Sequence, residues 1–176
     1  MRKQYLLILC GHPFSGKTTL AQAIVNQYDL AFVNLDEINR SRGVGIKGKP
    51  MTPRLWKETY ELGFKETKKL LQGGKSVVYE GANFTELLRS EILAITKHTN
   101  IIPIIIHVAT TQNECHKRLL HNRKTNSRYD VKDKDFSLVC NNFQIPTEKE
   151  AKVLTYNADS PLGYWLIENL DVCFKK

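Results

Sequence analysis

An apolar run from Tyr5 to Cys10 leads directly into a glycine-bounded loop, Gly11 to Thr18. A continuous apolar run that ends at glycine is typical of a strand buried on both faces of a parallel sheet. Beyond the loop, Leu20, Ile24 and Val25 share one helical stripe, which indicates an amphipathic helix. The order of strand, loop and helix therefore favours an α/β architecture, with the loop at the carboxyl end of a buried strand.

The loop reads Gly-His-Pro-Phe-Ser-Gly-Lys-Thr, which has the spacing of a phosphate-binding loop. Its glycines allow backbone N–H groups to wrap around phosphate, and the helix that follows adds its positive dipole end. Lys17 can reach the β- and γ-phosphates, and the Thr18 hydroxyl can ligate Mg²⁺. ATP and Mg²⁺ are therefore the predicted cofactors. The predicted nucleotide-binding residues are Gly11, His12, Pro13, Phe14, Ser15, Gly16, Lys17, Thr18 and Thr19.

Strands and helices alternate along the rest of the chain. Strands are predicted at 31–35, 76–79, 101–108 and 153–156, and helices at 53–72, 86–97, 112–121 and 162–170. We therefore predict an α/β fold of the P-loop NTPase type, a three-layer sandwich with about five parallel strands flanked by helices. The 176 residues are expected to form a single domain. Two segments, 39–50 and 122–134, break the alternation, and long loops of this kind are often functional.

Charge and cysteine content narrow the choice of partners and compartment. A net charge of +8 favours anionic partners such as nucleotides, phosphorylated metabolites or nucleic acid, although a merely basic surface is equally compatible. The four cysteines form no CxxC pair and have no zinc-site spacing, which indicates free thiols in a reducing cytoplasm. No stretch approaches the ~20 apolar residues of a membrane span. We expect a cytoplasmic protein with no membrane association and no obligate protein partner.

Two acidic residues follow predicted strands, at the same edge of the sheet as the loop. Asp36 closes the second strand, where it could accept the proton of an attacking hydroxyl; the alternative is an Asp that caps the next helix. Glu80 ends the third strand, where it could hold Mg²⁺ through water or orient a substrate; the alternative is a solvated strand-end acid. The chain has no Asn-Lys-x-Asp motif for guanine and is too short for a large ring ATPase, so a small kinase fits best.

Basic residues gather in and beside the two segments that break the alternation. Those that follow the fourth strand could form a lid, at about 118–134, that neutralises the transferring phosphoryl group; a solvated basic helix face is the alternative. The lid candidates are Arg118, Arg123, Lys124 and Arg128, of which Arg118 and Arg123 are the best placed. The others could bind a phosphate of the acceptor, with an unstructured surface loop as the alternative. They are Arg40, Arg42, Lys47 and Lys49.

In this order, the features resemble the small P-loop kinases grouped with the 5′-kinase domain of phage polynucleotide kinase, the zeta toxins and the chloramphenicol phosphotransferases. The resemblance covers about residues 4–160. The residues that carry it are the Gly11–Thr18 loop, Asp36, Arg40, the segment 78–84, Arg89, Arg118 and Arg123. The segment 142–148 also resembles the family's tail, where the chain passes near the adenine base. One departure is Glu80, since the family usually has Asp at that position.

The resemblance implies ATP-dependent transfer to a hydroxyl, with Asp36 as the general base, Arg40 in contact with the acceptor and Arg123 acting from the lid. The expected substrate-binding residues are Arg40, Arg42, Glu80, Asn83 and Arg89. The acceptor pocket is expected within 39–62 and 84–89, and the acceptor is a small molecule or a nucleic-acid 5′ end. Two alternatives stay open: an ATP-binding regulatory or toxin-like protein, and a stand-alone ATPase module. Asp36 distinguishes them, because a protein that only binds ATP needs no base there.

Overall fold

A computed structural model of the chain describes residues 3–45, 49–125 and 130–175. Its strands are β1 (Gln4–Cys10), β2 (Ala31–Asn34), β3 (Val77–Glu80), β4 (Ile101–Val108) and β5 (Lys152–Tyr156). Its helices are α1 (Lys17–Tyr28), α2 (Leu35–Ser41), α3 (Pro53–Gln72), α4 (Glu86–Leu93), the short 3₁₀ helix η1 (Ala94–Thr96), α5 (Gln112–Thr125), α6 (Asp133–Asn141) and α7 (Leu162–Phe174).

The strands of the described ranges form one five-stranded parallel sheet in the order β2-β3-β1-β4-β5. β1 lies at its centre, between β3 and β4. Successive side chains of a strand point to opposite faces, so Leu7 and Leu9 belong to one core and Leu6 and Ile8 to the other. This double burial explains the continuous apolar run, and the predicted P-loop NTPase fold is confirmed.

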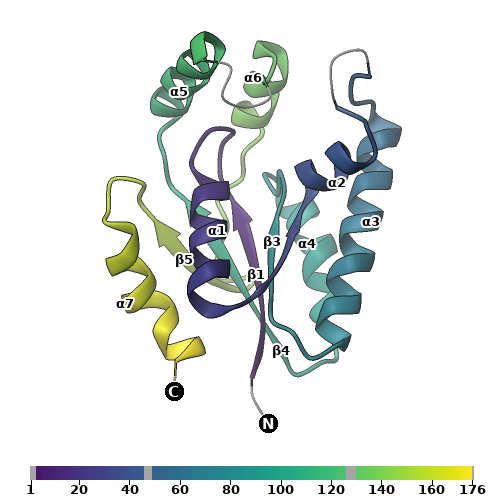
Figure 1. Cartoon of the computed structure of the whole chain (residues 1–176), viewed down its shortest axis with the longest axis vertical. Coiled ribbons are helices and arrows are strands. Elements are labelled where there is room, and N and C mark those ends of the chain that lie inside the picture. The colour runs from purple at the N-terminus through teal and green to yellow at the C-terminus, as the bar shows by residue number, and fades with distance from the viewer. Residues whose placement is uncertain (1–2, 46–48, 126–129, 176) are drawn as a thin grey trace.

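Helices cover both faces of the sheet (Figure 1). Leu20 of α1 and Leu166 of α7 are buried in the core on one face, and Leu71 of α3 and Ile92 of α4 in the core on the other. α5 and α6 lie above the loop that joins β1 to α1. That loop stands at the carboxyl edge of the sheet, where open parallel sheets bind their ligands.

The second strand is shorter than expected, and a helix follows it at once. The side chain of Asn34 accepts a hydrogen bond of 2.8 Å from the N–H of Glu37 and so caps α2. Asp36 therefore lies in the first turn of α2 and neither closes a strand nor caps the helix. The sequence suggests that Asp36 ends the strand or caps the helix. In the structure Asn34 does both, and Asp36 lies two residues further along, inside α2.

The segment 122–134 is expected to be a polar loop, but its described parts are mostly helical. α5 continues to Thr125, and α6 begins at Asp133, so the segment predicted as a lid is helical at both of its described ends. Lys47 and Arg128, which belong to the two predicted basic groups, lie outside the described residues. Within the described ranges, no helix has both the length and the apolar character that crossing a membrane requires.

Candidate functional site

The loop between β1 and α1 needs glycine at two positions. A β-carbon on Gly11, whose φ is 151°, would lie 2.8 Å from the Val108 carbonyl oxygen. Gly16, directly before α1, has a φ of 102°, which side chains rarely allow. The Ser15 carbonyl accepts a hydrogen bond of 2.8 Å from the Thr110 hydroxyl, which ties the loop to the chain after β4. Contacts with β4 and the segment after it thus hold the backbone of the loop.

Lys17 supplies the positive charge of this loop. Its ammonium donates to the carbonyl oxygens of Gly11 and His12, at 3.0 and 2.7 Å. The His12 ring packs against Phe143 with the ring centroids 4.7 Å apart, and Phe143 stacks on His107 at 5.4 Å. Burial lowers the pKa of both histidines. His12 is therefore neutral at physiological pH, and the charge that faces a phosphate comes from Lys17.

Glu80 joins the ends of three strands. The sheet register pairs Glu80 of β3 with Leu9 of β1 and with Asn34 of β2. Its carboxylate accepts one hydrogen bond from the Thr18 hydroxyl and one from the Asn34 amide, each of 2.6 Å. Burial raises the pKa of Glu80, and the bond from Thr18 and the charge of Lys17 oppose this rise. The structure thus brings the two predicted metal ligands, Thr18 and Glu80, into contact.

This pair of oxygen groups fits a Mg²⁺ ion. Mg²⁺ prefers hard oxygen ligands and is usually held by one or two carboxylates together with substrate phosphates. The Glu80 carboxylate lies beside the Thr18 hydroxyl in a residue that is 6% exposed. A divalent cation there would supply the positive charge that a buried carboxylate lacks.

Asp36 is the accessible carboxylate of the same edge. It is exposed in the first turn of α2. The charge of Asp36 contributes to the raised pKa of Glu80, so the two carboxylates are close enough to interact electrostatically. One carboxylate is therefore buried beside the phosphate-binding loop, and the other is open to a substrate.

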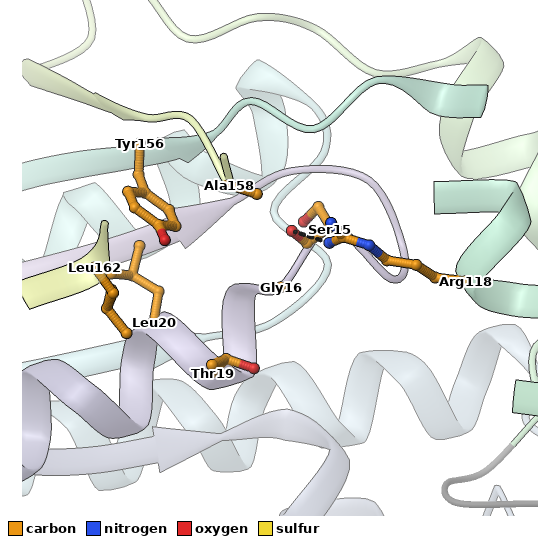
Figure 2. Close-up of a pocket in the computed structure, with 8 residues that line it drawn as sticks. All are labelled: Ser15, Gly16, Thr19, Leu20, Arg118, Tyr156, Ala158 and Leu162. Carbon is orange, nitrogen blue, oxygen red and sulfur yellow. Dashed lines mark hydrogen bonds between the residues drawn. The ribbon is translucent and has the colours of Figure 1, made fainter. Parts of the chain in front are cut away.

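Arg118 reaches from α5 to the phosphate-binding loop (Figure 2). Its Nη1 donates to the carbonyl oxygen of Ser15 at 3.3 Å and lies 3.5 Å from that of Phe14. A pocket lies beside this contact, polar toward the loop and apolar toward the chain that follows β5. Its lining residues are Ser15, Gly16, Thr19, Leu20, Arg118, Tyr156, Ala158 and Leu162. Such a pocket suits the base of a nucleotide whose phosphates lie in the loop.

The second arginine of the predicted lid bonds to the first residue of α6 and to the segment just before it. The Arg123 guanidinium contacts Asp130 at 3.0 Å and Asp133 at 2.9 Å, and it donates to the Val131 carbonyl at 3.0 Å. These bonds join the end of α5 to the start of α6. The structure therefore brings Arg118, but not Arg123, to the phosphate-binding loop.

Arg89 and Asn83 do not face the site, contrary to the expectation that they bind substrate. Arg89 is fully buried and forms a two-point ion pair with Glu150, at 2.7 and 2.9 Å. It also donates to the carbonyl oxygens of Asn83 and Gln144. Asn83 is 1% exposed, and its amide donates to the Leu9 carbonyl at 2.8 Å. Both side chains hold the backbone around the site, because their partners are buried protein groups.

Arg42 also has a structural partner. Its guanidinium contacts Glu58 at 2.6 Å and the Thr59 hydroxyl at 2.7 Å, which ties α2 to α3. Arg40, in contrast, is exposed in the last turn of α2. Lys49, the other described residue of this basic group, is exposed as well. Of this group, Arg40 and Lys49 are thus accessible to an acceptor, whereas Arg42 is engaged.

The segment 142–148 does not line the pocket of Figure 2. Phe143 packs between His12 and His107, and the Gln144 carbonyl accepts a bond from Arg89. The pocket is lined instead by Tyr156, the last residue of β5, and by Ala158 and Leu162, which follow it. The contact with adenine that the resemblance implies for 142–148 therefore has no counterpart in this pocket.

The AAA domain family matches residues 6–146, a span that includes the phosphate-binding loop, Asp36, Glu80 and both lid arginines. The chain belongs to the AAA domain family. No curated protein sequence matches it. The match places the phosphate-binding loop, Asp36 and Glu80 within one AAA domain.

Solved structures with the same fold as this AAA domain include kinases. A candidate kinase from Chloroflexus aurantiacus has a TM-score of 0.75 at 22% identity, with 98% of each chain covered. Kti12 of Chaetomium thermophilum, in complex with ADP-AlF3, has a TM-score of 0.76 at 11% identity, with 97% of this chain and 100% of that chain covered. The APS kinase CysC of Mycobacterium tuberculosis, in complex with AMPPNP and APS, has a TM-score of 0.69 at 13% identity, with 98% of each chain covered. At these identities the likeness concerns the fold.

Several residues at this AAA domain site are absent from the sequence prediction. Asn34 holds Glu80 and caps α2, and its signal is present, since Asn at the end of an apolar run with Glu three residues later marks a helix start. Thr110 ties down the loop, and Tyr156 and Leu162 line the pocket. No local pattern identifies these three, because their role depends on which strands become neighbours.

Proposed function

We propose that this AAA domain protein is an ATP-dependent kinase that transfers the γ-phosphoryl group to a hydroxyl of a small molecule or of a nucleic-acid 5′ end. The observation that carries the proposal is the meeting of three strand ends at one edge of the sheet. The phosphate-binding loop follows β1, Asp36 lies just after β2, and Glu80 ends β3 in contact with Thr18. One site thus combines a phosphate cradle, an accessible carboxylate and a pair of oxygen ligands for a cation.

The nucleotide is proposed to lie across the loop and the pocket of Figure 2. Its phosphates would bind the N–H groups of the loop and Lys17. Its base would lie between Arg118 and the apolar side of the pocket, because a planar guanidinium stacks well on aromatic rings. Mg²⁺, bound through Thr18 and Glu80, would neutralise charge on the β- and γ-phosphates. The fold shared with structures that hold ADP-AlF3 or AMPPNP supports this arrangement.

Asp36 is the proposed general base. The acceptor oxygen attacks the γ-phosphorus, the bond to the oxygen that bridges the β- and γ-phosphates breaks, and ADP leaves. The proton of the acceptor hydroxyl passes to the Asp36 carboxylate. Arg40 lies four residues further along α2, on the same helix face, where it can contact an anionic group of the acceptor. Arg123 is the proposed cation for the transferring phosphoryl group, and to reach that group it would exchange its bonds to Asp130 and Asp133 for bonds to the phosphoryl oxygens.

The test of the function is a transfer assay with γ-labelled ATP. The purified protein is incubated with a panel of phosphorylated and unphosphorylated metabolites and of oligonucleotides with a 5′ hydroxyl. Label on one acceptor class supports the kinase and names its substrate. Hydrolysis of ATP that no acceptor accelerates would instead support an ATPase module or a nucleotide-controlled switch.

Asp36→Asn tests the proposed base. It should leave ATP affinity nearly unchanged and slow transfer about 10²–10⁴-fold, because an amide cannot take the proton. Glu37→Gln is the matched control, since Glu37 is exposed in the same first turn of α2 and its loss removes the same charge from the same helix end. Equal transfer rates in the two variants would exclude Asp36 from the chemistry.

A further inference from the structure

Phe14 has an unusual backbone conformation within the phosphate-binding loop. Its φ is 64°, in the left-handed region that glycine adopts freely and bulky residues rarely adopt. Its side chain is nevertheless buried, with 6% exposure. A bulky residue persists in such a conformation only where its surroundings compensate, and an outlier of this kind is a pointer to function.

The compensation comes from the lid helices. The Phe14 ring belongs to a small apolar core that is separate from the two cores of the sheet. The other buried members of this core are Cys115 and Leu119 of α5 and Phe136 and Cys140 of α6. One side chain of the phosphate-binding loop thus packs into both helices that lie above it in Figure 1.

The same junction carries polar contacts. Arg118 lies on α5 between Cys115 and Leu119, the two α5 residues of the apolar core, and its guanidinium touches the Phe14 and Ser15 carbonyl oxygens. In Figure 2, Arg118 extends from α5 across to Ser15. The place of Arg118 beside the loop therefore depends on how α5 is seated on Phe14.

We propose that Phe14 is a positioning residue that couples phosphate binding in the loop to the seating of α5 and α6. Phosphate binding aligns the N–H groups of the loop, and the backbone of Phe14 is part of that alignment. Because the core around the ring is closely packed, a reorientation of Phe14 moves the helices that surround it. The inference rests on the proposed function only in that the loop binds a nucleotide, and it does not require phosphoryl transfer.

The test is hydrogen exchange of α5 (112–125) and α6 (133–141), with and without AMPPNP, on the full chain. In the wild-type protein, AMPPNP should slow exchange in both helices. Phe14→Gly removes the ring at a φ of 64° that glycine adopts freely, and its exchange is compared with that of the wild type at AMPPNP concentrations that saturate each protein. The slowing of exchange by AMPPNP should fall at least about fivefold, the lower end of typical couplings between sites.

A ring that only filled space would behave differently. Its loss would speed exchange equally with and without AMPPNP and leave the difference between the two states intact. Phe14→Leu, which keeps an apolar side chain in the core, should restore much of the difference. Phe136→Ala removes an α6 side chain from the same core without altering the loop sequence, and it should reproduce the Phe14→Gly result. Combining the two changes should add little, because both remove an aromatic ring from the same small core.

Phe143→Ala is the matched control, because Phe143 contacts the loop at His12 but is not part of the core around Phe14. It should leave the AMPPNP-induced difference in place. Full protection of α5 and α6 by AMPPNP in Phe14→Gly or Phe136→Ala would overturn the coupling and leave the kinase proposal standing. Absence of AMPPNP binding to the wild-type protein would overturn both. Should Phe14→Gly not fold, Phe136→Ala decides the question.

Discussion

Replacement of Arg89 by Met should destabilise the protein strongly without a direct effect on nucleotide binding. Arg89 is fully buried, and its partner Glu150 has a side chain that is 6% exposed. The guanidinium makes two bonds to this carboxylate and one to each of two backbone carbonyls, those of Asn83 and Gln144. Arg89→Met would leave the carboxylate buried without its positive charge and both carbonyls without this donor.

The expected loss is about 3–5 kcal/mol, the usual result of removing one partner of a buried ion pair. For a chain of this length, each kcal/mol shifts the melting temperature by about 2–4 °C, so Tm should fall by roughly 6–20 °C. The double variant with Arg89→Met and Glu150→Leu should be more stable than Arg89→Met alone, because it leaves no unpaired charge.

Urea unfolding followed by circular dichroism measures these differences, and calorimetry gives the Tm values. AMPPNP affinity is measured at a temperature where all variants are folded, and it should match the wild type. A loss of stability below about 1 kcal/mol in Arg89→Met would refute the reasoning, since that is the range of exposed pairs. If the more stable double variant binds ATP normally but no longer transfers the phosphoryl group, Arg89 binds the substrate, as the sequence predicts.

Three further outcomes concern the site itself. Lys17→Ala should weaken ATP binding about 10- to 150-fold, which is the loss expected when a hydrogen bond to a charged group is removed. Equilibrium titration measures this affinity, and an unchanged value would contradict the assignment of the phosphate-binding loop. Arg123→Ala should lower turnover about 10²–10³-fold, which is more than it lowers ATP affinity. Arg118→Ala should mainly weaken ATP binding, by roughly 2- to 30-fold. Steady-state kinetics measures both effects, and the reverse pattern would mean that the two arginines have exchanged roles. Burial raises the pKa of Glu80 in the metal-free protein, so Mg²⁺ binding, which needs the ionised carboxylate, should weaken at a higher pH than at an ordinary glutamate. Asn34→Ala removes a hydrogen bond that lowers this pKa and should move the loss of Mg²⁺ binding, measured by titration at several pH values, further upward.

Local patterns in the sequence were sufficient to predict the fold and the place of the phosphate-binding loop. Burial on both faces leaves a continuous apolar run in a strand, as in β1. An N-cap residue followed by proline marks a helix start, as Thr52 and Pro53 do for α3. The required glycines and Lys17 belong to one short motif, and Lys17 donates to carbonyl oxygens five and six residues before it. Such features depend on backbone conformation and nearest neighbours, and a sequence displays both directly.

Only the tertiary structure decided what the more distant side chains do. The partner of Arg89 is 61 residues away and that of Thr18 is 62 residues away, so no spacing rule connects them. The sequence around an arginine is the same whether its side chain faces a ligand or a buried glutamate. Which of the two it faces depends on whether the fold buries the side chain, as it does for Arg89 beside Glu150. Phe14 is the clearest case. Its place in the loop sequence does not predict that it shares a core with α5 and α6, because that core forms only when the sheet brings the ends of β1 and β4 together.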